Sequence, residues 1–136
     1  MKFVLVALFS YLIGSIPFSY IIAKVFFKKD IRSMGSGNPG TTNVFRNFGA
    51  LAGCFCLFLD MAKGLVAVYF SMFFLGEKYA LTALVFVVLG HIFSIFLKFK
   101  GGKGVATSAG ALFAYDLRVF LCLLILSLIH ISEPTR

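Results

Sequence analysis

The sequence predicts an all-α integral membrane protein, a multi-span helical bundle, and three observations support this fold class. Hydrophobic residues make up 60% of the 136 residues, and the mean hydropathy is +0.99, which is too apolar for an ordinary water-soluble domain. The apolar residues form four stretches, at about residues 3–27, 51–75, 80–97 and 105–131. The first three are each close to the ~20 residues that cross a ~30 Å hydrocarbon core, so we expect three transmembrane helices there.

The first stretch contains Pro17, which removes one backbone hydrogen bond and is expected to kink the helix. Small residues four positions apart, Ser10 with Gly14 and Ser15 with Ser19, favour close packing of this helix against others. No cleavage site of the A-x-A type follows, and the apolar run is too long for the core of a signal peptide. We therefore expect a retained first helix.

The second stretch carries small residues at Gly64, Ala67 and Ser71, which again favour close helix contact. It also carries two ionisable residues, Asp60 and Lys63. At positions i and i+3 of a helix their side chains are neighbours, so we expect an ion pair buried in the membrane. The alternative is that the two residues orient a polar site.

The third stretch carries His91, and an ionisable side chain within a lipid-embedded segment is a functional candidate by default. The alternative is a packing histidine whose hydrogen bonds are satisfied inside the protein. The fourth stretch is interrupted by Asp116-Leu117-Arg118, so we expect two shorter segments, one of them re-entrant or interfacial.

Composition also excludes several functional classes. The net charge is +8, from 13 Lys and Arg against five Asp and Glu, but juxtamembrane loops explain it better than a nucleic-acid partner. Cys54, Cys56 and Cys122 have no CxxC spacing, which argues against a zinc site and a disulfide framework. We expect buried cysteines, no bound metal and no cofactor.

Basic residues cluster in two loops, one between the first two stretches and one after the third, whereas the loop between the second and third stretches has only Glu77 and Lys78. The clustered residues are Lys28, Lys29, Arg32 and Arg46 in the first loop, with Lys98, Lys100 and Lys103 in the second. Positive loops face the cytoplasm, so both loops are expected there. An odd number of crossings then places the N-terminus outside.

The first loop, Gly35 to Arg46, packs three glycines, two amides, three hydroxyls and one guanidinium into twelve residues. Glycines allow positive φ, so that successive N–H groups can point at one anion, and an arginine can bind phosphate oxygens bidentately. A helix that begins near Thr41 would add its N-terminal dipole. This loop is expected to bind phosphate; the alternative is a tight turn between two membrane helices.

The second loop, Lys98 to Thr107, offers three lysines over a glycine-rich backbone. If the preceding helix continues, positions 91, 94 and 98 fall on one helical face, so that His91 and Ser94 line the approach to the lysines. The alternative is a basic loop that only sets the topology. Because both loops are expected on one membrane face, we expect them to form one site.

Ser36-Gly37-Asn38-Pro39-Gly40-Thr41-Thr42-Asn43-Val44-Phe45-Arg46, together with Gly90-His91 and Lys98 to Thr107, resembles the first two signature motifs of the PlsY family of acyl-phosphate:glycerol-3-phosphate acyltransferases. Gly14 to Phe18 and Asp60 to Gly64 fit its pattern too. The resemblance implies transfer of a fatty acyl group from acyl phosphate to the 1-hydroxyl of sn-glycerol 3-phosphate. The products are lysophosphatidic acid and phosphate, at the inner membrane of a bacterium, without metal or cofactor.

The resemblance also implies the site residues. Ser36, Arg46 and Lys103 are expected to hold substrate phosphates, and His91 joins them as a catalytic candidate. The expected substrate-binding residues are Gly37, Asn38, Gly40, Thr41, Thr42 and Asn43 in the first loop, with Lys98, Lys100, Gly101, Gly102, Gly104 and Thr107 in the second.

The sequence departs from the family pattern in its C-terminal part. The family continues through seven helices and has a third motif with His and Asn, which this chain lacks before it ends at Arg136. We expect residues 1–125 to form a partial acyltransferase domain. Residues 126–136 fit no family pattern and resemble translated sequencing adapter, so His130 is not expected to be the missing histidine. Two alternatives are a small anion or phosphate transporter and an inactive fragment of the acyltransferase.

Overall fold

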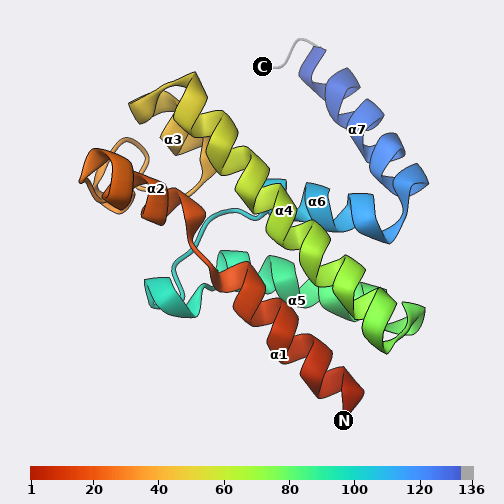
Figure 1. Cartoon of the computed structure of the whole chain (residues 1–136). Helices are drawn as coiled ribbons and strands as arrows, with labels where there is room; N and C mark the ends of the chain where they lie inside the picture. The colour runs from red at the N-terminus through yellow and green to blue at the C-terminus, as the bar shows by residue number, and fades with distance from the viewer. Residues whose placement is uncertain (133–136) are drawn as a thin grey trace.

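The structure, a computed structural model, describes residues 1–132, and all regular elements in this range are helical (Figure 1). In chain order the elements are α1 (Lys2–Ser15), α2 (Phe18–Phe27), η1 (Ile31–Ser33), α3 (Thr41–Phe48), α4 (Ala50–Leu75), η2 (Glu77–Tyr79), α5 (Ala80–Ile92), η3 (Ile95–Leu97), α6 (Val105–Tyr115) and α7 (Leu117–Ser132). The helices labelled α1, α4, α5 and α6 form the centre of the molecule.

Three segments are long and apolar enough to cross a membrane: Lys2–Phe27, Ala50–Leu75 and Glu77–Leu97. They match the first three apolar stretches of the sequence, which confirms the prediction of three spans. The fourth stretch is divided into α6 and α7 at Asp116, as predicted, because this residue leaves the helical conformation and accepts a hydrogen bond from Arg118 N at 2.9 Å.

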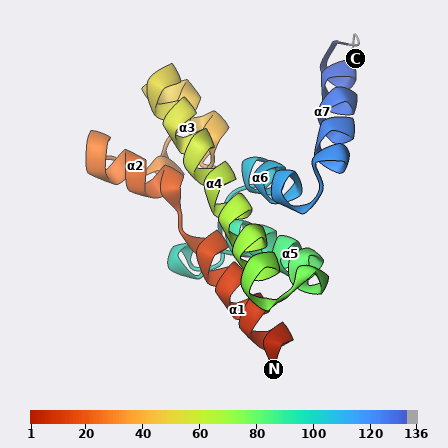
Figure 2. The same ribbon diagram turned by 45° about the vertical axis from the view of Figure 1, so that its right-hand side comes forward.

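The first span is two helices rather than one kinked helix. α1 ends at Ser15 and α2 begins at Phe18, and Figures 1 and 2 show α2 turning away from the direction of α1. Pro17 has no N–H to continue the helical ladder, which explains the break. Instead, Phe18 N donates to Ile16 O at 3.1 Å across the proline.

Glycines bring the central helices together in two pairs. A Cβ atom at Gly14 would collide with the backbone of Val87, and one at Gly90 with the backbone of Tyr11, so α1 and α5 touch backbone to backbone. α4 and α6 make the same kind of contact through Gly64 and Gly110. Within a bilayer, helices associate by such close packing rather than by exclusion of water.

The core is correspondingly made of small side chains. It contains Val6, Ala67, Val68, Ala80, Ala83, Val87 and Ala111, all at most 2% exposed. The bulky apolar side chains point outward instead, among them Phe58 and Phe73 on α4. This inverted pattern suits a protein whose surroundings are hydrocarbon.

α7 packs against α6 and otherwise extends away from the bundle (Figures 1 and 2). Its leucines, such as Leu121 and Leu126, are 44% and 60% exposed. The division of the chain at residue 125 stays a prediction. Of the segment 126–136, residues 133–136 lie outside the described part of the chain.

Candidate functional site

The first loop begins after η1 and ends in α3. Gly35 and Gly37 have φ of 51° and 76°, in the left-handed region that favours glycine. α3 starts at Thr41. The condition under which a helix dipole would assist anion binding in this loop is thus met, and the glycine turns agree with the prediction.

Asn43 holds the first loop in shape. Its Nδ2 donates to Met34 O at 2.9 Å, to Asn38 O at 3.1 Å and to Ile31 O at 3.3 Å. Its Oδ1 accepts from Ser36 N at 3.3 Å and from Asn47 Nδ2 at 2.8 Å. Because the residue is 1% exposed and its amide is fully engaged, it shapes the loop instead of facing a ligand.

The second loop differs from the prediction made for its preceding helix. α5 ends at Ile92, so residues 91, 94 and 98 do not share a helical face. The chain turns back because Gly101 N donates to Ile92 O at 2.8 Å and Gly102 N donates to His91 O at 3.2 Å. Ser94 then lies against α1, where its hydroxyl donates to Ser15 O. The expectation that residues 91, 94 and 98 share a helical face was therefore wrong, and Ser94 does not line the central pocket described below, whereas His91 lines it together with Lys103.

The two loops meet at Gly102, as predicted for loops on one membrane face. A Cβ atom at this position would lie 2.5 Å from His91 Nε2 and 2.9 Å from Pro39 O. Gly102 is thus enclosed between the end of α5 and the first loop. It acts by permitting this approach, since it is buried beneath the surface that a ligand would contact.

A pocket of about 350 Å³ with both polar and apolar lining residues, the central pocket, opens between the loops. Seven predicted site residues line it: Asn38, Gly40, Thr41, Thr42, His91, Lys103 and Gly104. Its remaining lining residues are Phe45, Leu57, Asp60, Val105, Ala106 and Ala109. The apolar residues on this list were not predicted, because nothing in a helical apolar run marks which side chain faces a pocket.

A second pocket of about 440 Å³, the outer pocket, lies on the other side of Asn38 and Pro39. Five predicted residues line it, namely Ser36, Gly37, Asn38, Lys100 and Gly101, and Arg32 and Pro39 complete the wall. Arg32 was recognised only as part of a basic loop. Its position four residues before Ser36 is the feature of the sequence that could have indicated a place beside the first loop.

Besides Asn43 and Gly102, three predicted residues lie outside both pockets. Arg46 is exposed one helical turn after Thr42, on the same side of α3, and makes no ion pair or hydrogen bond with any described residue. Lys98 is exposed in the turn that follows η3. Thr107 is fully buried in α6, where its carbonyl abuts Gly64, so it serves helix packing.

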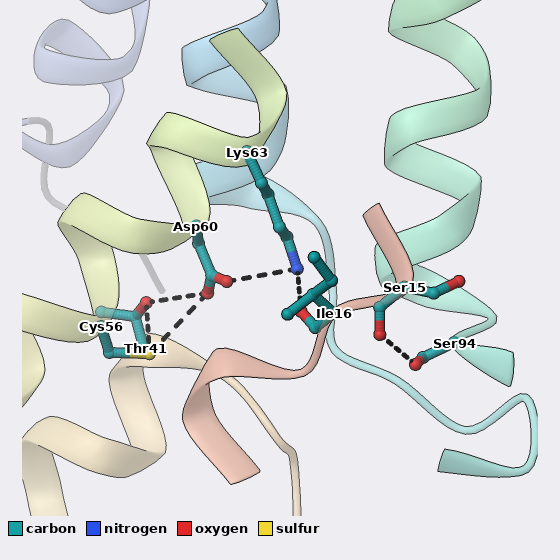
Figure 3. Close-up of polar contacts among 7 residues, drawn as sticks. All are labelled: Ser15, Ile16, Thr41, Cys56, Asp60, Lys63 and Ser94. Carbon is teal, nitrogen blue, oxygen red and sulfur yellow. Dashed lines mark hydrogen bonds and ion pairs between the residues drawn. The ribbon is translucent and has the colours of Figure 1, made fainter. Parts of the chain in front are cut away.

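Asp60 and Lys63 form the predicted buried ion pair, with Lys63 Nζ 3.3 Å from Asp60 Oδ1 (Figure 3). Asp60 and Lys63 are 1% and 4% exposed. Asp60 Oδ2 also accepts from Thr41 Oγ1 at 3.5 Å, and Lys63 Nζ donates to Ile16 O at 2.8 Å. The pair therefore connects α4 with both the first loop and the first span.

The charge of the site is positive. Asp60 is neutralised by Lys63, while Lys100 and Lys103 have no ionic partner among residues 1–132. Arg32 is bound by Asp30 at 2.9 Å, and its side-chain hydrogen bonds lower the pKa of the Asp30 carboxyl to about 2. Both pockets thus offer unpaired cations and backbone or hydroxyl donors, which is the chemistry that binds phosphate.

An apolar groove of about 430 Å³ continues from the central pocket along α6 to α7. The two share Lys103, Gly104, Val105 and Ala109. Beyond these residues the groove is lined mainly by Leu112, Phe120, Leu123 and Leu124. Lys103 therefore stands where the central pocket, which carries the side chains of Thr41, Thr42 and His91, passes into a groove lined mainly by leucine and phenylalanine.

Comparison with known proteins agrees with this geometry. Residues 4–132 match the family model described as glycerol-3-phosphate acyltransferase. The glycerol-3-phosphate acyltransferase 2 of Lactobacillus johnsonii is 49% identical over 129 residues, which cover 92% of this chain and 59% of that protein. The glycerol-3-phosphate acyltransferase of Endomicrobium trichonymphae is 50% identical over 112 residues, 82% of this chain and 56% of that protein.

Solved structures are similar as well. The crystal structure of PlsY, an integral membrane glycerol 3-phosphate acyltransferase, in its glycerol 3-phosphate form has a TM-score of 0.81 and 39% identity, and the match covers 92% of this chain and 63% of that one. The lysophosphatidic acid form has a TM-score of 0.78, 38% identity and coverages of 92% and 62%. The chain spans less than two thirds of the length of each of these proteins. The fold, the paired loops and these matches lead to one conclusion: the chain belongs to the glycerol-3-phosphate acyltransferase family.

Proposed function

We propose that this protein transfers a fatty acyl group from acyl phosphate to the 1-hydroxyl of sn-glycerol 3-phosphate, giving lysophosphatidic acid and phosphate. The observation that carries the proposal is the continuity of the central pocket with the apolar groove through Lys103. An acyl phosphate has a charged head and a long apolar tail, and it fits such a pair of pockets. The matched structures in glycerol 3-phosphate and lysophosphatidic acid forms support the same acyl acceptor and the same product.

The central and outer pockets suit a reaction between two phosphate compounds. The central pocket contributes Lys103 and the hydroxyls of Thr41 and Thr42, and the outer pocket contributes Lys100 and Ser36. Arg46 is exposed one helical turn after Thr42, at the edge of the central pocket. From there its planar guanidinium can bind a phosphate held in the pocket. We assign Ser36, Arg46 and Lys103 to phosphate binding and His91 to the wall of the central pocket.

The reaction needs positioning more than it needs a nucleophile from the protein. The glycerol hydroxyl oxygen attacks the acyl carbonyl carbon and forms the ester C–O bond, while the C–O bond to phosphate breaks. The hydroxyl proton passes to an oxygen of the departing phosphate, so atoms and charge balance without an acyl-enzyme. Lysines beside the phosphate stabilise the charge that develops, and fixed pockets hold the reactants in line.

We further propose that the site faces the cytoplasm of a bacterial inner membrane, with Met1 outside. Both substrates are then available from the cytoplasmic side, and the basic loops obey the positive-inside rule. The Lys2–Phe27, Ala50–Leu75 and Glu77–Leu97 spans supply the odd number of crossings that this orientation requires.

The test is phosphate release from palmitoyl phosphate and glycerol 3-phosphate in lipid nanodiscs with EDTA present. Two proteins are assayed: the chain itself, and a chimaera in which residues 1–125 replace the aligned segment of the Staphylococcus haemolyticus relative, which is 45% identical to this chain over 135 residues. We expect the chimaera to release phosphate only when both substrates are present and to form lysophosphatidic acid in equal amount. A folded chimaera that forms no lysophosphatidic acid, or that requires a metal or acyl-CoA, would contradict the proposal.

A further inference from the structure

The break in the first span leaves a backbone carbonyl that a side chain from another helix satisfies. Ile16 O accepts from Phe18 N at 3.1 Å and from Lys63 Nζ at 2.8 Å. Irregular backbone at membrane depth is tolerated only where the protein itself supplies hydrogen-bond partners. Lys63 on α4 is therefore part of what allows the chain to leave the helix at Pro17.

The same ammonium group begins a chain of contacts that ends at the first loop (Figure 3). Lys63 Nζ lies 3.3 Å from Asp60 Oδ1, and Asp60 Oδ2 accepts from Thr41 Oγ1 at 3.5 Å. Thr41 is the first residue of α3. The contacts thus join the break at Ile16 to the helix that carries the phosphate-binding loop.

Lys63 sits among the parts of the site without lining the central pocket. It faces a small cavity of about 10 Å³ that Ile16, Pro39, His91 and Gly102 also line. Asp60, in contrast, lines the central pocket. Lys63 would therefore affect a substrate in that pocket only indirectly, through neighbours such as Asp60 that line the pocket.

We propose that Lys63 is a positioning residue for the acyl transfer proposed above, on which this inference rests. By binding Ile16 O and Asp60 together, it holds the break before α2 and the start of α3 against α4, and so fixes the first loop in the position from which Pro39 meets Gly102 of the second loop. Its role is more than to neutralise Asp60. If neutralisation were its only role, the position of the loops would not depend on the link to Ile16.

A double variant separates the two roles. Lys63→Met alone leaves Asp60 buried without a partner, and such a stranded charge destabilises the fold whichever role is correct. Asp60→Asn combined with Lys63→Met removes both charges and keeps a group that can accept from Thr41. It deletes the contacts of Lys63 with the first span, which are the hydrogen bond to Ile16 O and the approach of Nζ to the Phe18 ring at 5.7 Å. Lys78→Met is the control, because it removes a positive charge from the exposed turn between α4 and α5.

The first measurement is amide hydrogen exchange of the chain in nanodiscs, which needs no catalytic activity. We expect the double variant to unfold close to the wild-type temperature. Its segments 18–20 and 39–44 should nevertheless exchange about tenfold faster or more, because local opening becomes easier when the link is lost. Lys78→Met should leave both segments unchanged.

The second measurement is turnover by the chimaera that carries the same double variant. A residue that acts through others should change kcat rather than binding, so we expect kcat to fall about 10²-fold and KM for glycerol 3-phosphate to change less than about threefold. Wild-type exchange in both segments of the double variant would overturn the positioning role. An inactive wild-type chimaera with faster exchange in the variant would refute the proposed function and leave the positioning role standing.

Discussion

Replacement of Gly102 by alanine tests whether the two loops form one pocket. The added Cβ would lie 2.5 Å from His91 Nε2, whereas non-bonded heavy atoms prefer about 3.5 Å or more, so the imidazole must move by about 1 Å. His91 is only 8% exposed and Pro39 O lies 2.9 Å from the same Cβ, so little free space exists for that movement.

We expect two effects of Gly102→Ala. Overpacking of this kind lowers the free energy of unfolding by about 1–3 kcal/mol. A displacement of about 1 Å in the wall of the central pocket lowers turnover by about 10²-fold. Unfolding is measured through the reaction of a thiol-reactive fluorophore with Cys56, which is fully buried, after Cys54 and Cys122 have been replaced by alanine.

The control for this prediction is the double variant Gly102→Ala with His91→Ala. Removing the imidazole makes room for the new methyl group, so part of the lost stability should return if the two residues touch. Turnover is compared in the chimaera, where the rest of the family fold is present. A Gly102→Ala protein with wild-type stability and wild-type turnover would show that the loops do not meet at this glycine.

Three further predictions concern the basic loops. Arg46→Lys keeps the charge but loses the planar fork, so kcat/KM for glycerol 3-phosphate should fall by the equivalent of ~1–3 kcal/mol; an unchanged value would remove Arg46 from the phosphate ligands. A cysteine in place of Ser33 should be labelled by an impermeant reagent only from the cytoplasmic side, and labelling in intact cells would reverse the proposed orientation. The pKa of Asp30 is lowered from 3.8 to about 2, so its link to Arg32 stabilises η1 fully above pH ~4 and is lost as pH falls towards 2. The amide of Arg32 should therefore be protected from exchange at pH 5 and lose protection near pH 2, and Asp30→Asn should abolish the difference.

The buried pair on α4 shows how far sequence reasoning extends. Spacing alone predicted that Asp60 and Lys63 neutralise one another, because side chains at i and i+3 on a helix are neighbours. It did not indicate that Lys63 would reach the carbonyl of Ile16 on another span or that Asp60 would line a pocket. The contact of Lys63 with Ile16 joins residues 47 positions apart, and that of Asp60 with Thr41 joins residues 19 positions apart. Local periodicity does not encode contacts over such separations.

Helix ends show the same limit. Pro17 and the Asp116 interruption were readable as breaks because each changes the local backbone chemistry. The end of α5 at Ile92 could not be predicted, since residues 80–97 contain no proline and no Asp, Glu, Lys or Arg that would mark a break. The helix stops there because the amides of Gly101 and Gly102 donate hydrogen bonds to the carbonyls of Ile92 and His91. These hydrogen bonds require the second loop to fold back.

The sequence by itself determined that the chain lies in a membrane and where its spans begin and end to within a few residues. It also singled out the two glycine-rich basic loops that we predict to bind phosphate. These properties follow from hydropathy, charge and residue type, which act locally. Only the tertiary structure decided which of those residues share a pocket. In the structure, His91 and Lys103 line the central pocket, and an apolar groove begins at Lys103. Asn43 and Thr107, in contrast, are buried. The physical reason is that close approach of α1 to α5 and of α4 to α6 depends on glycine contacts between distant segments, and the position of both loops follows from that packing.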